Sequence, residues 1–322
     1  MTTRFRVVSV ALVMTVSLGA AGCGKYSYGN LRAMKEFKEA NDRYRAQEWK
    51  RAADKYEAAV AANPDLVAGG VTPYFFLGNS YDNLFKSTRV GEAENDAYMQ
   101  KAIENYKKSA QKDTDPIMRK RAMEYLVAAY GPDKLNDPSQ AEPIVLDMIR
   151  IEPSEPTSYF ALSKIYEDAG RYEEAEQALL KARDAKPNDP VVYTTMSGFY
   201  NRQGDFVKTI EGLQKAADLE PTNPQGFHLI ATYYEEKARK DFRITPAEKK
   251  EFAIKGIEAE DKALSLNPNY VDAMVYKNIL LRQQANAETD RAKQEALIAQ
   301  ADALRNKAIQ LQKGAKAAAT TK

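Results

Sequence analysis

The sequence predicts an all-α protein built from stacked helix pairs, an α-solenoid, and two observations carry this prediction. First, a pattern returns after 34 residues: "YEDAGRYEEAEQALLKARDAKPNDP" at 166–190 aligns with "YNRQGDFVKTIEGLQKAADLEPTNP" at 200–224. Second, apolar residues within each copy lie three or four apart, as on one face of a helix. The composition agrees, because 44% hydrophobic and 29% charged residues favour a folded chain over a disordered one.

Each copy reads as two helices joined by a tight turn. A glycine, Gly170 or Gly204, interrupts the apolar pattern and permits the turn. Asp189-Pro190 and Asn223-Pro224 then begin the next helix, with a capping oxygen followed by proline at the first helical position. A helix of about 12–15 residues is marginal alone, so such hairpins must cover one another's apolar faces.

This unit strongly resembles the tetratricopeptide repeat, whose 34-residue pattern it follows. The first copy matches at Tyr159, Leu162, Ser163, Tyr166, Gly170, Ala175, Leu179, Ala182 and Pro187. The next copy matches at Tyr193, Met196, Ser197, Tyr200, Gly204, Thr209, Leu213, Ala216 and Pro221. The resemblance implies a right-handed α-solenoid of about six such hairpins with a C-terminal capping helix.

The resemblance extends over residues 34–285. We expect repeats near 34–67, 71–115, 119–155, 156–189, 190–223 and 224–270, followed by a degenerate helix. In the first of these, Gln47 replaces the turn glycine.

Two repeats carry insertions between their helices, near 85–99 and 237–252. In the second insertion Thr245, Pro246 and Glu248 form a capping box, which predicts a lengthened helix starting at Thr245. An insertion at this place is either an extra contact ridge or a tolerated surface elongation, and elongation is the simpler expectation.

A long helix is expected over 286–312, followed by a disordered tail at 313–322. Its apolar stripe, formed by Leu297, Ala301, Leu304, Ala308 and Leu311, has a spacing of four and three. Such a stripe covers the open end of a solenoid or forms a coiled-coil seam, and we favour the cap.

The N-terminus reads as an export signal. Arg4 and Arg6 precede an apolar run at 7–18, and small residues occupy 19–22. The apolar run is short for a membrane span of about 20 residues, so 1–22 is expected to be a removable signal peptide.

Cys23 follows the small residues and is the only cysteine. The stretch "LGAAGC" resembles the lipobox of bacterial lipoproteins, although Ala20 stands where leucine is preferred. The resemblance implies lipid attachment at Cys23, with 23–33 as a tether. It also implies membrane anchoring through N-terminal acyl chains. Because Gly24, not aspartate, follows the cysteine, we expect an envelope location at the outer membrane, facing the periplasm.

Several kinds of chemistry are disfavoured by the residue counts. Lys and Arg total 47 against 45 Asp and Glu, so no basic excess indicates a nucleic-acid partner. With one cysteine and a single histidine, His228, the chain offers neither an intramolecular disulfide nor a Cys/His zinc cluster. We expect no metal, no cofactor and no enzymatic activity.

In tetratricopeptide proteins the first helices of the repeats line a concave groove that binds a protein or peptide. The positions that this resemblance assigns to the groove are Phe37, Asn41, Tyr44, Phe75, Asn79, Asp82, Arg121, Phe160, Lys164, Glu167, Thr194, Asn201, His228 and Glu235. The expected function is therefore a membrane-anchored scaffold in bacterial envelope assembly or export. The alternatives are a structural protein that self-associates through its C-terminal helix and, less favoured, an enzyme with an unrecognised site.

Overall fold

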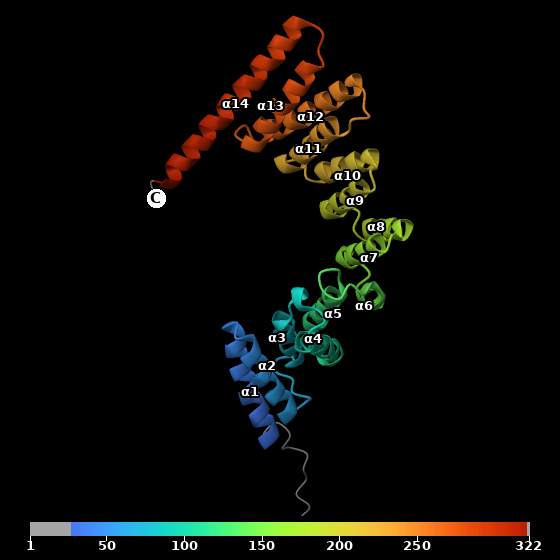
Figure 1. The fold of residues 1–322 in the computed structure, drawn as a ribbon, viewed down its shortest axis with the longest axis vertical. Coiled ribbons are helices and arrows are strands. Elements are labelled where there is room, and N and C mark those ends of the chain that lie inside the picture. Colours follow the sequence, from blue (N-terminus) through green and yellow to red (C-terminus); the bar gives the residue numbers. More distant parts are fainter. Residues whose placement is uncertain (1–26, 321–322) are drawn as a thin grey trace, which may run out of the picture. The chain divides into compact units, whose positions relative to one another are not determined.

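The computed structural model describes residues 27–320, and it describes side chains as far as residue 314. These residues form fourteen α-helices, with a short 3-10 helix and one isolated bridge between Ala68 and Val71 (Figure 1). The predicted all-α fold is confirmed. The signal peptide and Cys23 lie outside the described residues.

The chain divides into two compact units, of which the first ends at Val145 and the second begins at Leu146. The helices of the first unit are α1 (Tyr28–Arg45), α2 (Trp49–Ala62), α3 (Tyr74–Leu84), α4 (Ala93–Lys112) and α5 (Pro116–Tyr130). Helix α6 (Pro138–Ile151) contains the boundary. Each helix from α1 to α5 packs on the next, and α3 also contacts α5.

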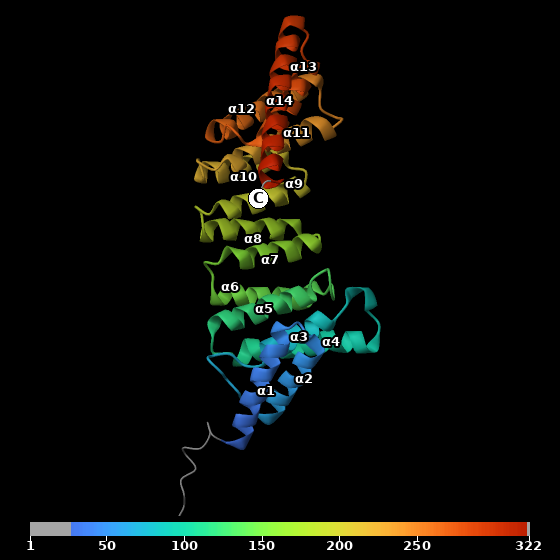
Figure 2. The ribbon, with the colours of Figure 1, turned by 90° about the vertical axis from the view of Figure 1, so that its left-hand side faces the viewer.

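Within the second unit each helix likewise packs on the next (Figure 2). Its helices are α7 (Pro156–Asp168), α8 (Tyr172–Ala185), α9 (Pro190–Arg202), α10 (Phe206–Leu219), α11 (Pro224–Lys240), α12 (Pro246–Leu266), α13 (Val271–Asn286) and α14 (Arg291–Thr320). Consecutive helices pack as pairs, and α11 also contacts α13. Consecutive helix pairs of this kind are the arrangement of an α-solenoid.

The turns inside the hairpins have the backbone that the sequence predicts. Gly170 and Gly204 have φ of 74° and 78°, in the left-handed region. Gln47, which replaces the glycine in the first repeat, adopts the same region with φ of 57°. The turn geometry therefore recurs even where the residue type does not.

The recurring tyrosines and prolines are explained by one hydrogen bond. The hydroxyl of Tyr74 donates to the carbonyl of Pro64 at 2.9 Å. Tyr159 and Tyr193 make the same bond to the carbonyls of Pro153 and Pro187, at 3.0 Å and 2.7 Å. The tyrosine at the start of each of these repeats thus holds the loop that leads into it.

Small residues bring the helices together in the core. Ala175 and Ala182 of α8 are fully buried beside Leu179, and the cluster includes Tyr159 and Met196 of the flanking first helices. Close-packed interiors of this kind tolerate little change in volume, which explains why these positions recur.

The capping box of α12 is confirmed. The backbone N–H of Glu248 donates to the Thr245 hydroxyl, and the Glu248 carboxylate accepts from the Thr245 N–H at 2.6 Å.

Helix α1 begins at Tyr28 because the Ser27 side chain caps it, accepting from the N–H of Asn30 at 3.2 Å. The tether that we expected over 23–33 is therefore helical from residue 28.

Helix α14 packs along α13 and extends beyond it in both views (Figures 1 and 2). Ala301 and Ala308 of its stripe are buried, so the stripe covers the end of the second unit as a cap. The helix continues to Thr320, past residue 312, where we expected a disordered tail to begin. None of the described helices combines the length and the apolar character needed to cross a membrane.

Candidate functional site

The first unit contains an open cleft with a volume of about 480 Å³. It lies where the end of α3 meets the start of α2, the first insertion and the α5–α6 loop. The residues that line it are Trp49, Asn79, Asp82, Asn83, Phe85, Ser87, Tyr125, Asp133 and Lys134.

Aromatic rings from α2 and α5, together with Phe85 after the end of α3, form the walls. Trp49, at the first position of α2, packs edge-on against Tyr44 of α1, with ring centroids 5.3 Å apart. Tyr125 of α5 packs against Phe75 and Tyr106 at 5.3 Å and 5.4 Å, and its side chain is 36% exposed. These rings present apolar surface to the cleft while the neighbouring rings hold them in place.

A chain of hydrogen bonds runs beneath the aromatic walls. The Tyr44 hydroxyl donates to Asn79 Oδ1 at 2.6 Å, and Asn79 Nδ2 donates to the Tyr106 hydroxyl at 3.3 Å. That hydroxyl donates in turn to Asp82 Oδ2 at 3.1 Å, and Lys134 Nζ donates to Asp82 Oδ1. The chain joins α1, α3, α4 and the α5–α6 loop, so it fixes the floor of the cleft before any partner arrives.

Burial favours the neutral form of the hydroxyls in this chain. Desolvation raises the pKa of Tyr44, with a smaller contribution from Tyr125, while Arg121 opposes the shift. Burial likewise raises the pKa of Tyr106 well above its ordinary range. Both hydroxyls therefore remain hydrogen-bond donors throughout the physiological pH range.

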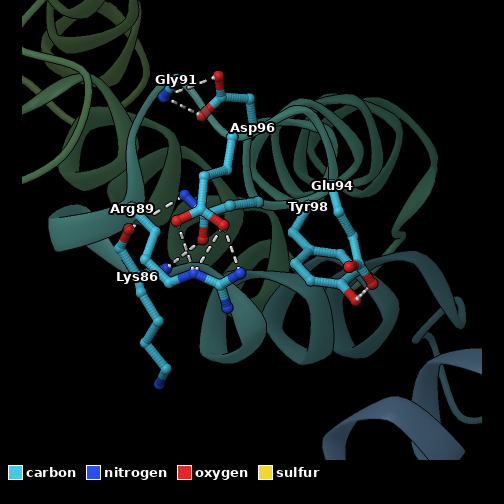
Figure 3. A network of polar contacts seen from close by, with 8 residues as sticks. Lys86, Arg89, Gly91, Glu94, Asp96 and Tyr98 are labelled. Atoms are coloured by element: carbon cyan, nitrogen blue, oxygen red, sulfur yellow. Dashed lines mark hydrogen bonds and ion pairs between the residues drawn. The ribbon is translucent and has the colours of Figure 1, made fainter.

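The first insertion forms a loop held by polar contacts (Figure 3). Its residues Phe85 and Ser87 line one side of the cleft. Asn95 accepts from the backbone N–H of Lys86 at 2.8 Å and donates to its carbonyl at 3.0 Å. The backbone N–H of Gly91, where φ is 95°, donates to the Asp96 carboxylate at 3.1 Å. Arg89 pairs with Glu92 at 2.9 Å. These bonds hold Phe85 and Ser87 at the wall.

Three of the predicted groove residues lie on this site. Tyr44, Asn79 and Asp82 belong to its hydrogen-bond chain. Arg121 is exposed one turn before Tyr125. Asn41 is engaged elsewhere, because it accepts from the buried Tyr56 hydroxyl at 2.7 Å.

For Phe37 and Phe75 the groove prediction is wrong. Both side chains are buried in the core, at 8% and 3% exposed, because each packs against a tyrosine of the neighbouring helix. They support the groove wall from behind and offer no surface to a partner.

In the second unit, α7 and α9 carry a smaller set of the predicted residues. Arg202 makes a two-pronged ion pair with Glu167, at 2.7 Å and 2.9 Å, and so joins the two first helices. Lys164 pairs with Asp168 on its own helix. Thr194 and Asn201 are exposed, and Phe160 is half-buried.

The two predicted groove residues of α11 are engaged by neighbouring helices. Glu235 is buried and accepts hydrogen bonds from Arg239 and from Gln283 of α13, both at 3.0 Å. His228 Nδ1 lies 2.7 Å from Oε1 of the fully buried Glu260 in α12. Both side chains face neighbouring helices, and the contact between α11 and α13 uses them for packing.

Burial raises the pKa of Glu260 to about 7, and the hydrogen bond to His228 reduces this effect. The other carboxylate oxygen of Glu260 has no hydrogen-bond partner among the described residues. The pair lies behind the rings of Tyr270 and Tyr276, each with its centroid 5.1 Å from that of the histidine. No group of acidic, histidine or cysteine residues in the described part of the chain could hold a metal ion.

Of the nine residues that line the cleft, the groove prediction includes Asn79 and Asp82 and misses the other seven, among them Trp49, Tyr125 and Lys134. Trp49 carried a usable signal, because large aromatic residues also stand at the first position of the second helix at Tyr172 and Phe206. Lys134 carried none, since its partner Asp82 lies 52 residues earlier in the chain.

The comparisons with known proteins agree with this geometry. A family model of the tetratricopeptide repeat matches residues 134–197. The C-terminal part of a repeat-containing protein of this kind from Cytophaga hutchinsonii superimposes with a TM-score of 0.54 and 17% identity, over 85% of this chain and 98% of that one. No match was found among curated proteins.

Two further solved structures are similar. A tetratricopeptide repeat protein from Parabacteroides merdae has 11% identity and a TM-score of 0.47, over 84% of this chain and 99% of that one. YrrB, described as having an unusual peptide-binding site, has 17% identity and a TM-score of 0.41, over 61% of this chain and 91% of that one. The fold is that of a tetratricopeptide repeat solenoid.

Proposed function

We propose that this chain, a tetratricopeptide repeat protein by its repeat motif and its fold, is a scaffold that binds an extended segment of a protein partner in the cleft of the first unit. The observation that carries the proposal is the fixed hydrogen-bond chain from Tyr44 to Lys134 beneath an open aromatic cleft. A floor that is already ordered costs little conformational entropy on binding.

The cleft offers groups that suit an extended peptide. Trp49 and Tyr125 supply apolar faces for side chains, and the exposed Asn83 lies at the lining. Asp133 is exposed and has no ion-pair partner among the described residues, so it is available to a cationic group of the partner. Aromatic anchors with a few directed polar groups are the usual composition of such sites.

We further propose that the scaffold is held at a bacterial membrane by acyl chains on Cys23 and serves envelope assembly or export. The support comes from the sequence, in which a basic start, a short apolar run and small residues precede the only cysteine. The test is mass spectrometry of the mature N-terminus. An acylated Cys23 is expected, and a mature terminus at any other residue would defeat this part of the proposal.

The binding proposal is tested by site-specific crosslinking. Benzoylphenylalanine replaces Trp49 in the cleft or, as a control, Tyr172, which is at the same helix position in another repeat and lies outside the cleft. We expect a protein adduct from position 49 and none from position 172. The same adducts from both positions would refute the proposal.

A second test uses the single tryptophan of the chain as a reporter. Because Trp49 lines the cleft, titrating the identified partner should change its fluorescence. Tyr125→Ser and Asp133→Asn should weaken the response about tenfold or more, whereas Tyr172→Ser should not. Thermal melts followed by circular dichroism establish that the variants remain folded.

A third test deletes the first insertion, and two similar contact triads define the residues to remove. In the first triad, the Tyr81 hydroxyl and the Lys101 ammonium both donate to the Glu57 carboxylate, and Lys101 lies 4.7 Å from the centroid of the Tyr81 ring. Glu176, Tyr200 and Lys208 form the same triad, with the lysine at 4.8 Å, in a repeat without an insertion.

The two triads show how long the insertion is. The tyrosine and lysine are 20 residues apart in the first triad and 8 in the second, so the insertion amounts to 12 residues. Deleting 86–97 with Phe85→Gly should therefore preserve the fold and the triad while abolishing the Trp49 response. A deletion variant that binds with unchanged affinity would show that the insertion plays no part in recognition.

A further inference from the structure

We infer that the second insertion builds a separate binding cleft in the second unit, and that this cleft takes an acidic, apolar segment of a protein partner. It shares no residue with the cleft of the first unit. The cleft has a volume of about 350 Å³ and lies between α9, α10, α11 and the α11–α12 loop. Its lining residues are Asn201, Phe206, Tyr233, Glu236, Lys237, Lys240, Asp241, Phe242 and Arg243.

Phe242 is the most unusual residue of this cleft. Its side chain is 89% exposed, although a phenylalanine at a loop tip gains nothing for folding from that position. Hydrogen bonds within the loop fix the position of Phe242. Asp241 accepts from the backbone N–H of Arg243 at 3.0 Å and from the Arg243 guanidinium at 2.9 Å.

The same carboxylate fastens the loop to the helix before it. Lys237 of α11 donates to Asp241 at 2.8 Å, and its ammonium group lies 5.3 Å from the centroid of the Phe206 ring in α10. The hydrogen bonds to Arg243 and Lys237 hold the pKa of Asp241 well below its ordinary value, so these contacts persist across the physiological range. Phe242 is therefore presented at the cleft by a pre-ordered loop, as an anchor residue is.

The charges that face solvent at the mouth are mainly positive. The side chains of Arg243 and Lys240 are 75% and 61% exposed, whereas that of Asp241 is 11% exposed. Glu236 is 46% exposed and pairs with Lys240, so the lining holds three cations and two acids and keeps a net positive charge. A partner carboxylate can approach the exposed ends of Lys240 and Arg243 while its apolar neighbour enters the cleft between Phe206 and Phe242. This complementarity selects an acidic segment.

The second cleft has the same construction as the first. In each, the aromatic residue at the first position of a second helix, Trp49 of α2 or Phe206 of α10, faces the insertion carried by the next repeat. The repeat that contains α8 shows the same aromatic position without an insertion in the repeat that follows. Tyr172 begins α8, the next repeat has no insertion, and the tyrosine is 50% exposed. The insertion thus turns a lone aromatic residue into the wall of a cleft.

A recessed cleft favours a protein segment over a flat membrane surface, because a bilayer cannot place atoms beside Phe206. The test uses a fluorescein-labelled 12-residue peptide of alternating Glu and Leu, and a twin in which Lys replaces Glu. Fluorescence anisotropy with the purified protein measures both. We expect the acidic peptide to bind at least tenfold more tightly than its twin, and this preference to decline with added salt.

Variants assign the binding to the cleft. Phe242→Ser and the double change Lys240→Glu with Arg243→Glu should each weaken binding at least tenfold, and Tyr172→Ser should leave it unchanged. Because the Phe242 side chain is exposed, Phe242→Ser should melt at the wild-type temperature, and circular dichroism establishes that the double variant, which loses the Arg243–Asp241 pair, remains folded. The Trp49 fluorescence should not respond to the peptide, which separates this site from the cleft of the first unit.

Four outcomes would overturn the inference. These are equal binding of the two peptides, no measurable binding of the acidic peptide, binding unchanged in Phe242→Ser, and binding that Tyr172→Ser removes as well. A fifth would replace it. If vesicles containing phosphatidylglycerol sediment the wild type but not Phe242→Ser, and the acidic peptide does not bind, the loop contacts lipid and not a protein segment.

Discussion

Glu260 makes the stability of the second unit depend on pH, and the size of the effect follows from its surroundings. The carboxyl is fully buried, one oxygen meets His228 at 2.7 Å, and the other oxygen has no partner among the described residues. Burial raises its pKa from an ordinary value of 4.5 to about 7. The folded state therefore binds this proton more tightly than the unfolded state does.

The sign follows from this difference. Stability from the protonated carboxyl is fully present below pH 4.5 and is lost as the pH rises through about 7. At about 1.36 kcal/mol per pKa unit, the full effect is about 3 kcal/mol, and most of it falls between pH 5 and 8. Lys277, Asp261 and the two neighbouring tyrosines are the other titratable groups of α12 and α13 around the pair.

The assay is urea unfolding at pH 5, 6, 7 and 8 for the wild type and Glu260→Gln. Glutamine fills the same space and does not titrate, so the variant should lose most of this pH dependence. Glu258→Gln, an exposed position of the same helix, is the matched control and should follow the wild type. Wild-type and Glu260→Gln curves that remain parallel from pH 5 to 8 would refute the reasoning.

Further predictions concern packing and capping. Gly78→Ala should lower the free energy of unfolding by about 1–3 kcal/mol, because a Cβ there would lie 2.9 Å from the Tyr106 ring, and urea unfolding measures this. Gly198→Ala should instead be neutral or raise it by up to about 1 kcal/mol, because its Cβ would meet only the flexible end of an arginine side chain at 3.4 Å. Thr245→Ala should cost about 0.5–2 kcal/mol through loss of the α12 capping box, and an unchanged unfolding midpoint would count against the cap.

The helix pairs and their turns could be predicted from the sequence, because they depend on residues close together in the chain. Asp189 caps α9, because its carboxylate accepts a hydrogen bond from the backbone N–H of Val191 at 2.9 Å. Gly170 and Gly204 supply the positive φ that the turns require. Thr245 and Glu248 cap each other across three residues. In each case the residues that determine the local structure lie within about three positions of one another, so the sequence pattern is sufficient to predict it.

The site could be predicted only in part, since the repeat pattern assigns a face to each residue but not its depth. Phe75 is on the expected face of α3 and is nevertheless buried, because Tyr106 and Tyr125 pack over its ring. Asp82 and Lys134 meet across 52 residues only after the hairpins have stacked. The burial of a side chain and its contacts with distant residues depend on tertiary packing, which cannot be predicted from the spacing of residues in one repeat.

The residues that recur in this chain are also the ones least free to bind a partner. The hydroxyls of the tyrosines at 74, 159 and 193 donate hydrogen bonds to carbonyls of the preceding loops. The recurring alanines are buried between helices. Recognition must then use positions that the repeat leaves unconstrained. Both clefts satisfy this condition, because each combines an aromatic residue at the start of a second helix with an insertion absent from the neighbouring repeats. Partner choice can thus differ between two repeat proteins of the same fold through a dozen inserted residues, while the packing that holds the hairpins together stays the same.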